Sequence, residues 1–342
     1  MPCSNNKPVF VVGSYRSGTS IFSWCLGQHP NLVNLPETNW LARLTVDLDN
    51  LYRLATINGK FSHLGQTGTS IDEFYRLFGE GVGHLIGVTN AILIDRTEKR
   101  VTGEFRRRRA ADDPKDRWVD ATPENSHYVY SLSKLFPEAR FIHLLRNPHD
   151  VARSLMKFSR SGGRDHGHEE AYRNWTRLSR AAYLGEQAMG GARMMRVRYE
   201  EFTGAPERTV KDVLGFLGEP YCADCLKPLD TKINSSQVEP EVVKTRESSS
   251  AVREAAELYQ QILSAPAPGM HGDPAAQADL QRDQEQRHAQ ERLQAREHIA
   301  GLDREVLQAQ RELQAIYAST SWRITGPLRG MARFFLAALR LR

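Results

Sequence analysis

The chain has 342 residues, 25% of them charged, and a formal net charge of +5. This length suits one large domain with extensions, and the modest charge argues against a nucleic-acid-binding protein. Apolar runs fall well short of the ~20 residues of a membrane span, and the polar first residues lack the pattern of a secretory signal, so we expect a cytoplasmic protein.

The first predicted element is a buried strand at residues 9–12, rich in β-branched and aromatic side chains. A loop with two glycines follows at residues 13–20, and then a helix. Backbone N–H groups at the start of such a helix bind phosphate-type anions, assisted by the helix dipole. The hydroxyls of Ser17, Thr19 and Ser20 can add hydrogen bonds.

The loop almost matches the nucleotide P-loop, G-x4-G-K-[ST], but Thr19 stands at the lysine position. That lysine normally contacts the phosphates of a nucleoside triphosphate. A 5′-phosphosulfate instead needs a cation at its bridging oxygen, where negative charge develops, and Arg16 is the only cation in the loop. The alternative is a glycine-rich turn that binds no ligand, and the loop by itself does not distinguish the two.

A short second strand is predicted at residues 31–35, which puts Glu37 near its carboxyl end. Ligands of open α/β sheets bind outside these ends, so Glu37 is a candidate site residue, with a solvated loop glutamate as the alternative. Leucine and phenylalanine spacing predicts helices between residues 41 and 99, interrupted by a loop at 59–70. The basic run at 106–109 is either a solvated face or a guide for an anionic ligand.

Two more strands are predicted at residues 118–121 and 139–145, and the second ends at Arg146. A P-loop hydrolase would place a magnesium-binding aspartate there. Arg146 instead offers a bidentate fork that suits phosphate, and Ser154 lies on the helix that follows. We expect the two to hold one phosphate together. The alternatives are a surface ion pair for Arg146 and an ordinary helix position for Ser154.

These segments resemble a known family. GSYRSGTS at 13–20 and RNPHDVARSL at 146–155 are similar to the 5′-phosphosulfate loop and the 3′-phosphate motif of sulfotransferases that use PAPS, 3′-phosphoadenosine 5′-phosphosulfate. VRYEEF at 197–202 looks like the family's strand and tyrosine-acid turn. The resemblance covers residues 7–250 and implies a P-loop-like central parallel sheet flanked by helices, with PAPS as co-substrate and no metal. The donor-binding residues that it implies are Arg16, Ser17, Gly18, Thr19, Ser20, Arg146 and Ser154.

The resemblance also implies catalytic residues. LPETNW at 35–40 is similar to the segment that carries the catalytic glutamate of protein-tyrosine sulfotransferases, which gives Glu37 the role of base. Ser236 matches a late serine that touches the sulfuryl group, and with Arg16 it would stabilise the developing charge. Asp120 is the reserve candidate for the base.

Two residues depart from the pattern of the family. Ala121 replaces a lysine that is frequent in related enzymes, so one sulfuryl-stabilising cation is missing. Asn39 replaces the arginine that follows the catalytic Glu-Thr in the tyrosine enzymes, which weakens the case for a tyrosine acceptor.

The chain is expected to divide into a sulfotransferase domain, a linker, a helical segment and a basic amphipathic tail, at residues 1–262, 263–276, 277–318 and 319–342. Apolar residues at 3–4 spacing from Ile299 to Ile316 suit a short coiled coil and hence a homo-oligomer, with a solvated helix as the alternative. The tail suits the inner face of an anionic membrane or a docking site on the enzyme or a partner.

Four functions compete at this stage. The first is sulfuryl transfer from PAPS to a hydroxyl of a saccharide or glycolipid, because the string that begins at Ser319 resembles tails of bacterial cell-surface polysaccharide glycosyltransferases. The second is a protein-tyrosine sulfotransferase. The third is a P-loop kinase or NTPase, and the fourth a non-catalytic scaffold. Four cysteines without disulfide spacing, of which Cys222 and Cys225 form a lone C-x-x-C pair, predict reduced thiols and no zinc site.

Overall fold

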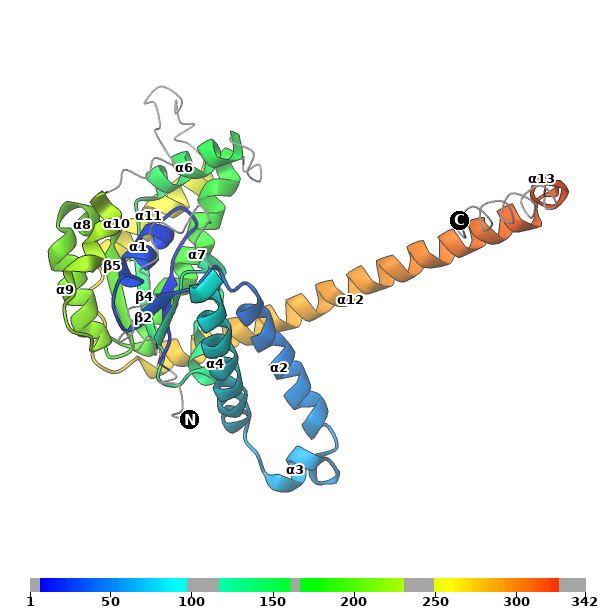
Figure 1. Cartoon of the computed structure of the whole chain (residues 1–342), viewed down its shortest axis with the longest axis horizontal. Helices are drawn as coiled ribbons and strands as arrows, with labels where there is room; N and C mark the ends of the chain where they lie inside the picture. The colour runs from blue at the N-terminus through cyan, green and yellow to red at the C-terminus, as the bar shows by residue number, and fades with distance from the viewer. Residues whose placement is uncertain (1–6, 97–116, 161–166, 231–248, 326–342) are drawn as a thin grey trace. The chain divides into compact units, whose positions relative to one another are not determined.

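In the computed structural model, which describes residues 7–96, 117–160, 167–230 and 249–325, the described chain contains one parallel sheet of five strands (Figure 1). The strands are β1 (Val9–Val12), β2 (Leu32–Asn34), β3 (Arg117–Asp120), β4 (Arg140–Leu145) and β5 (Met194–Arg198). Their order is β2-β3-β1-β4-β5, and every neighbouring pair is parallel. The predicted parallel sheet flanked by helices is confirmed.

Helices connect the strands, as parallel pairing requires. The α-helices in the described residues are α1 (Thr19–Leu26), α2 (Trp40–Thr56), α3 (His63–Thr67), α4 (Ile71–Arg96), α5 (Val129–Leu135), α6 (Pro148–Arg160), α7 (His168–Met189), α8 (Tyr199–Gly204), α9 (Pro206–Leu217), α10 (Lys227–Asp230), α11 (Ser250–Ser264), α12 (Pro274–Ala318) and α13 (Thr320–Ile324). Short 3-10 turns are η1 (Gly59–Phe61), η3 (Pro123–His127) and η4 (Ala223–Leu226).

The prediction of a loop at residues 59–70 is wrong in part, because η1 and α3 lie within it. Gly59 and Gly68 have positive φ angles of 52° and 67° and bracket these turns. Helices this short do not repeat an apolar position often enough for the sequence pattern to reveal them.

Alternating side chains of β1 enter two different cores. Val9 and Val11 pack with α1 and α9 on one face of the sheet. Phe10 and Val12 pack on the other face with residues of α2, α4, α5 and α7. All four residues are buried, as a central parallel strand with both faces covered requires.

A buried ionic network joins the sheet to α7. Glu186 of α7 pairs with His143 of β4 and with Arg196 of β5, and the side chains of His143 and Glu186 are fully buried. Burial opposes ionisation of Glu186, but the attraction of His143 and Arg196 outweighs it and lowers the pKa of the carboxyl group. The network therefore holds α7 against β4 and β5.

The chain falls into two compact units, residues 1–284 and 285–342. Ala276 and Leu280, near the start of α12, are buried in the core of the first unit. The finer division predicted at residues 262, 276 and 318 stays a prediction. Within the described residues, no helix is both long and apolar enough to cross a membrane.

Gly13, the residue directly after β1, has no room for a side chain. Its φ is +143°, and a Cβ atom there would lie 2.5 Å from the backbone oxygen of Leu144 in β4. Gly215 in α9 is a matched control, because a Cβ atom there meets open space.

We expect Gly13→Ala to lower the free energy of unfolding by about 2–4 kcal/mol, because both the backbone conformation and the contact with β4 are disturbed. Gly215→Ala should leave it unchanged or raise it by up to about 1 kcal/mol. Urea denaturation measures both. Equal unfolding midpoints for Gly13→Ala and the unsubstituted chain would contradict the prediction.

Candidate active site

The carboxyl ends of parallel strands lie at one edge of the sheet, and this edge carries the candidate residues. The loop at residues 13–18 follows β1, and Glu37 follows β2. Asp120 ends β3, Arg146 follows β4, and Tyr199 follows β5. Residues that are up to 186 positions apart in the sequence are thereby collected at one edge.

The loop after β1 has an unusual backbone directly before α1. Gly18 is left-handed with φ 95°, and Arg16 has a left-handed φ of 62°, which is uncommon for a residue with a side chain. A Cβ atom on Gly18 would collide with the ring of Tyr199. The oxygen Oγ of Ser17 is buried, and no described group shares a hydrogen bond with it. A buried hydroxyl without a partner fits a site that an anion completes.

Two arginines and a serine form the cationic side of the site. Arg16 donates from Nε to Oγ of Ser154 over 3.0 Å, and Ser154 is buried. Arg146 donates from Nη1 to the carbonyl oxygen of Arg16 over 2.9 Å. Burial, and then the positive charge of Arg146, lower the pKa of Arg16. A bound anion would relieve the repulsion between these guanidinium groups.

The surroundings of Arg146 fix its orientation. Its guanidinium lies 4.2 Å from the centroid of the Tyr199 ring, a cation–π contact. The indole Nε1 of Trp175 donates to its carbonyl oxygen over 3.0 Å. Glu200 accepts from the backbone N–H of Asn147 over 3.0 Å, at the start of α6. Tyr199 and Glu200, directly after β5, thus support the segment that follows β4, and Trp175 of α7 adds a contact that the sequence patterns do not predict.

Carboxylates form the opposite side of the site. Glu37 is solvent-accessible, yet its carboxylate is partly desolvated. This desolvation, followed by the negative charges of Glu124 and Asp120, raises its pKa. Tyr15 of the loop donates its hydroxyl to Oε1 of Glu124. Burial, and then Glu124, raise the pKa of Tyr15, so its phenol stays protonated.

Sequence patterns did not single out Tyr15 or Glu124. Their interaction joins residues 109 positions apart, which no local spacing can reveal. The remaining oxygen of Glu124, Oε2, is buried and has no hydrogen-bond partner among the described residues.

Asp120 is fully buried, and both of its oxygens are engaged. One oxygen accepts from the backbone N–H and the hydroxyl of Thr122, at 2.9 and 2.6 Å. The other accepts from the Thr38 hydroxyl and, over 2.8 Å, from Asn125 Nδ2. These contacts join the ends of β2 and β3 next to Glu37. They engage both oxygens of Asp120, whereas Glu37 is exposed to solvent.

Of the remaining predicted site residues, Thr19 and Ser20 lie within the described part of the chain and Ser236 does not. Thr19 is buried and Ser20 exposed, and both lie in the first turn of α1. Ser236 and the basic run at 106–109 lie outside the described residues. Among the residues that are described, no three His, Cys, Asp or Glu side chains group together as a metal site would require.

The fold and the site define a parallel α/β domain with a glycine-bearing loop, a group of cationic residues and a group of carboxylates at one edge of its sheet. A sequence model of the sulfotransferase family matches residues 8–223, well over half of the chain. This protein therefore belongs to the sulfotransferase family. Family membership decides against the kinase or NTPase and favours an enzyme over a scaffold.

The chain is similar to bacterial proteins. An uncharacterized protein of Aquifex aeolicus is 24% identical over 245 residues, which are 67% of this chain and 28% of that protein. Omega-hydroxy-beta-dihydromenaquinone-9 sulfotransferase Stf3 of Mycobacterium tuberculosis is 26% identical over 123 residues, 33% of this chain and 30% of that protein. This chain thus spans less than a third of either relative.

The sulfotransferase domain of the Synechococcus PCC 7002 olefin synthase is 18% identical, with a TM-score of 0.45, over 78% of this chain and 98% of that one. The sulfotransferase domain from the curacin biosynthetic pathway is 17% identical, with a TM-score of 0.41, over 82% and 96%. The match of the family model to residues 8–223 is what shows that this chain is a member.

We expect Asp120→Asn to lower the free energy of unfolding by about 2–4 kcal/mol, because the new amide N–H₂ group faces hydrogen-bond donors in a buried place. Asp212→Asn, on the exposed face of α9, is the control and should change it little. Urea denaturation measures both. An Asp120→Asn protein that is as stable as the unsubstituted chain but inactive would instead make Asp120 the base.

Proposed function

We propose that this sulfotransferase takes its sulfuryl group from PAPS, which carries an anionic group at each end. The observation that supports this most directly is the cluster of Arg16, Arg146 and Ser154 beside the loop at residues 13–18. In this cluster, Arg146 and Ser154 would hold the 3′-phosphate, because Arg146 is already oriented by Tyr199. The loop N–H groups and the unpartnered Ser17 hydroxyl would hold the 5′-phosphosulfate.

Glu37 is the proposed base. It is accessible to an acceptor, and its raised pKa makes it a better proton acceptor than an ordinary glutamate. As the acceptor oxygen forms its bond to sulfur, the bond from sulfur to the bridging phosphate oxygen breaks, and Glu37 takes the hydroxyl proton. The products are a sulfate ester and 3′-phosphoadenosine 5′-phosphate.

Negative charge builds on the bridging and sulfuryl oxygens during this displacement. We assign its stabilisation to the positive charge of Arg16 and to the loop N–H groups, with Ser236 as a further donor. Thr19 and Ser20 add hydroxyls from the first turn of α1. The proposed reaction needs no metal.

The proposed acceptor is a hydroxyl of a saccharide or glycolipid, and a tyrosine side chain is the alternative. An apolar surface supports the glycolipid. Trp40, three residues after Glu37, is 45% exposed at the start of α2, and further exposed apolar residues continue along α2 and α4. Figure 1 shows these helices side by side, joined through α3. Stf3 of Mycobacterium is named for a hydroxylated menaquinone acceptor, which is also a lipid. Transfer assays with a lipid-linked sugar, the free sugar and a tyrosine peptide would rank the three.

For the C-terminal segment we propose self-association through α12. Its residues Ile299, Leu302, Val306, Leu313 and Ile316 are all exposed, at the spacing of a coiled-coil seam. Sedimentation of the full chain measures the assembly, and a monomer would exclude it. The basic tail lies mostly beyond residue 325, outside the described part, and its attachment to the inner face of a membrane, with a cytoplasmic enzyme, stays a proposal.

The donor proposal predicts nucleotide binding that depends on the 3′-phosphate. Calorimetry without added metal should show that 3′-phosphoadenosine 5′-phosphate binds at least about tenfold more tightly than AMP, because Arg146 makes charge-assisted hydrogen bonds to the extra phosphate. Arg146→Ala should remove most of this difference, and Arg208→Ala, on the exposed face of α9, should not. A preference for Mg-ATP would overturn the proposal.

The base proposal predicts a shifted pH profile. A base works only when deprotonated, so the raised pKa of Glu37 places the acidic limb of kcat/KM above the range of an ordinary glutamate. Glu124→Gln removes a neighbouring negative charge, lowers the pKa of Glu37 and moves the limb to lower pH. Glu207→Gln, on exposed α9, should leave the limb in place.

Glu37→Ala completes this test. It should lower kcat by about 10²- to 10⁴-fold, the usual contribution of a general base, with nucleotide affinity nearly unchanged. Equal activity in Glu37→Ala and the unsubstituted enzyme would refute the assignment.

A further inference from the structure

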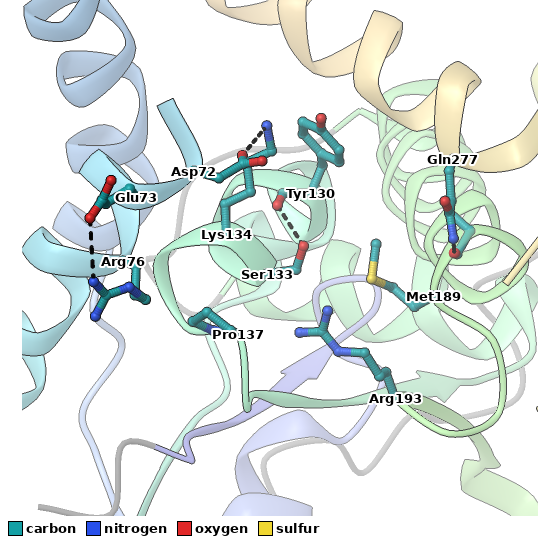
Figure 2. Close-up of a pocket in the computed structure, with 11 residues that line it drawn as sticks. Asp72, Glu73, Arg76, Tyr130, Ser133, Lys134, Pro137, Met189, Arg193 and Gln277 are labelled. Carbon is teal, nitrogen blue, oxygen red and sulfur yellow. Dashed lines mark hydrogen bonds and ion pairs between the residues drawn. The ribbon is translucent and has the colours of Figure 1, made fainter. Parts of the chain in front are cut away.

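A cavity of about 580 Å³ lies on the first unit, away from the residues assigned above (Figure 2). Its walls come from the start of α4, the end of α5, the end of α7, the turn before β5 and the start of α12. Pro137 and Arg193 lie before the amino ends of β4 and β5, whereas Arg146 and Tyr199 follow the carboxyl ends of the same strands. The cavity is therefore at the opposite edge of the sheet from the candidate active site.

Glycines allow the walls of this cavity to pack closely. A Cβ atom on Gly79 of α4 would collide with the backbone oxygen of Leu135 in α5. A Cβ atom on Gly272 would collide with the backbone oxygen of Ala188 in α7. Gln277 of α12 donates from Nε2 to this same oxygen over 3.0 Å. The walls are thus set by backbone contacts and do not depend on long side chains alone.

Most charges that line the cavity have partners. Lys134 pairs with Asp72 over 2.8 Å, and Arg76 pairs with Glu80 and lies 4.0 Å from Glu73. Arg193 differs, because its Nη2 is buried and has no hydrogen-bond partner among the described residues. Figure 2 shows its guanidinium directed into the space beside Pro137 and Met189.

A guanidinium nitrogen that loses water without gaining a partner is unfavourable. Burial, and then the neighbouring charge of Arg140, lower the pKa of Arg193. A bound anion would remove both costs. Since the other lining charges are paired, one additional negative charge matches the cavity better than two.

The rest of the lining suits an apolar body. Met189, Pro137, Ala188 and the ring of Tyr130 provide apolar surface, and the Lys134 ammonium lies 4.6 Å from the centroid of that ring. Cavities of this size with a few placed polar groups are typical of small-molecule sites.

We propose that this cavity binds a small organic carboxylate, whose planar head pairs with the Arg193 guanidinium and whose apolar part lies against Met189 and Pro137. The fork of an arginine matches a carboxylate with two parallel hydrogen bonds. The site is separate from the donor site, and the proposal does not depend on the identity of the donor.

Calorimetry on the full chain tests the proposal with benzoate and octanoate as probes. Benzamide, which is neutral, and inorganic phosphate, which carries more charge and no apolar part, are the comparison compounds. We expect the carboxylates to bind at millimolar concentration or below, and more tightly than either comparison compound. Arg193→Met should weaken carboxylate binding at least about tenfold, because a charge-assisted pair is lost.

Four controls locate the binding and exclude unfolding. Arg208→Met, on exposed α9, and Arg146→Ala, at the other edge of the sheet, should leave carboxylate affinity unchanged. Arg193→Met should unfold in urea at the same midpoint as the unsubstituted chain or higher, because Nη2 makes no hydrogen bond to any of the described residues. Met189→Trp, which fills the cavity without changing a charge, should also abolish octanoate binding.

The proposal is overturned if neither carboxylate binds at millimolar concentration, or if Arg193→Met binds both as well as the unsubstituted chain. It is also overturned if Arg193→Met unfolds at a clearly lower midpoint, because Arg193 would then stabilise the fold, or if Arg146→Ala alone removes the binding, because the probes would then occupy the donor site.

Discussion

The close approach of Gly13 to the backbone of Leu144 is the constraint on which the site depends. It brings the residue after β1 against Leu144 of β4, which is two residues before Arg146. The Arg16 carbonyl oxygen can therefore accept a hydrogen bond from Arg146, which ties the loop after β1 to the segment after β4. Because the contact is between backbone atoms, no rotamer change can relieve it. A side chain at Gly13 would separate the loop from the strand that carries its partner.

The loop also divides the site by charge. Tyr15 reaches the carboxylate side through Glu124, and the next residue, Arg16, reaches the cationic side through Ser154. The backbone of Arg16 is left-handed at this point, where the side chains of Tyr15 and Arg16 turn toward different partners. The proposed transfer needs such a division, because a base that lay among the arginines would have a lowered pKa. Partial desolvation, and then the negative charges of Glu124 and Asp120, raise the pKa of Glu37 instead.

Local patterns predicted the local parts of this arrangement. The apolar run of β1, the glycine spacing of the loop, and the strand that ends at Arg146 each lie within a few residues, so their periodicity and turn chemistry are legible in the sequence. The partners of Asp120, the contact between Tyr15 and Glu124, and the unpartnered nitrogen of Arg193 depend on residues far apart in the chain. Asp120 illustrates how far local patterns reach. Its place in the sequence makes it a second candidate base, whereas the four groups that donate hydrogen bonds to its carboxylate come together only in the folded chain.

Strands β4 and β5 connect the proposed carboxylate cavity at one edge of the sheet with the candidate active site at the other edge. β4 and β5 are paired over five positions, so they form a stiff connection between the Arg193 cavity and the Arg146 site. A ligand shifts a conformational equilibrium only by the difference in its affinity for the two states. The helices that line the cavity are α4, α5, α7 and the first turns of α12, and a carboxylate bound to Arg193 among them would stabilise their packing on one another. Occupation of the cavity should therefore act first on the stability of these helices, and on sulfuryl transfer only where a shift of the helices changes the surroundings of Glu37.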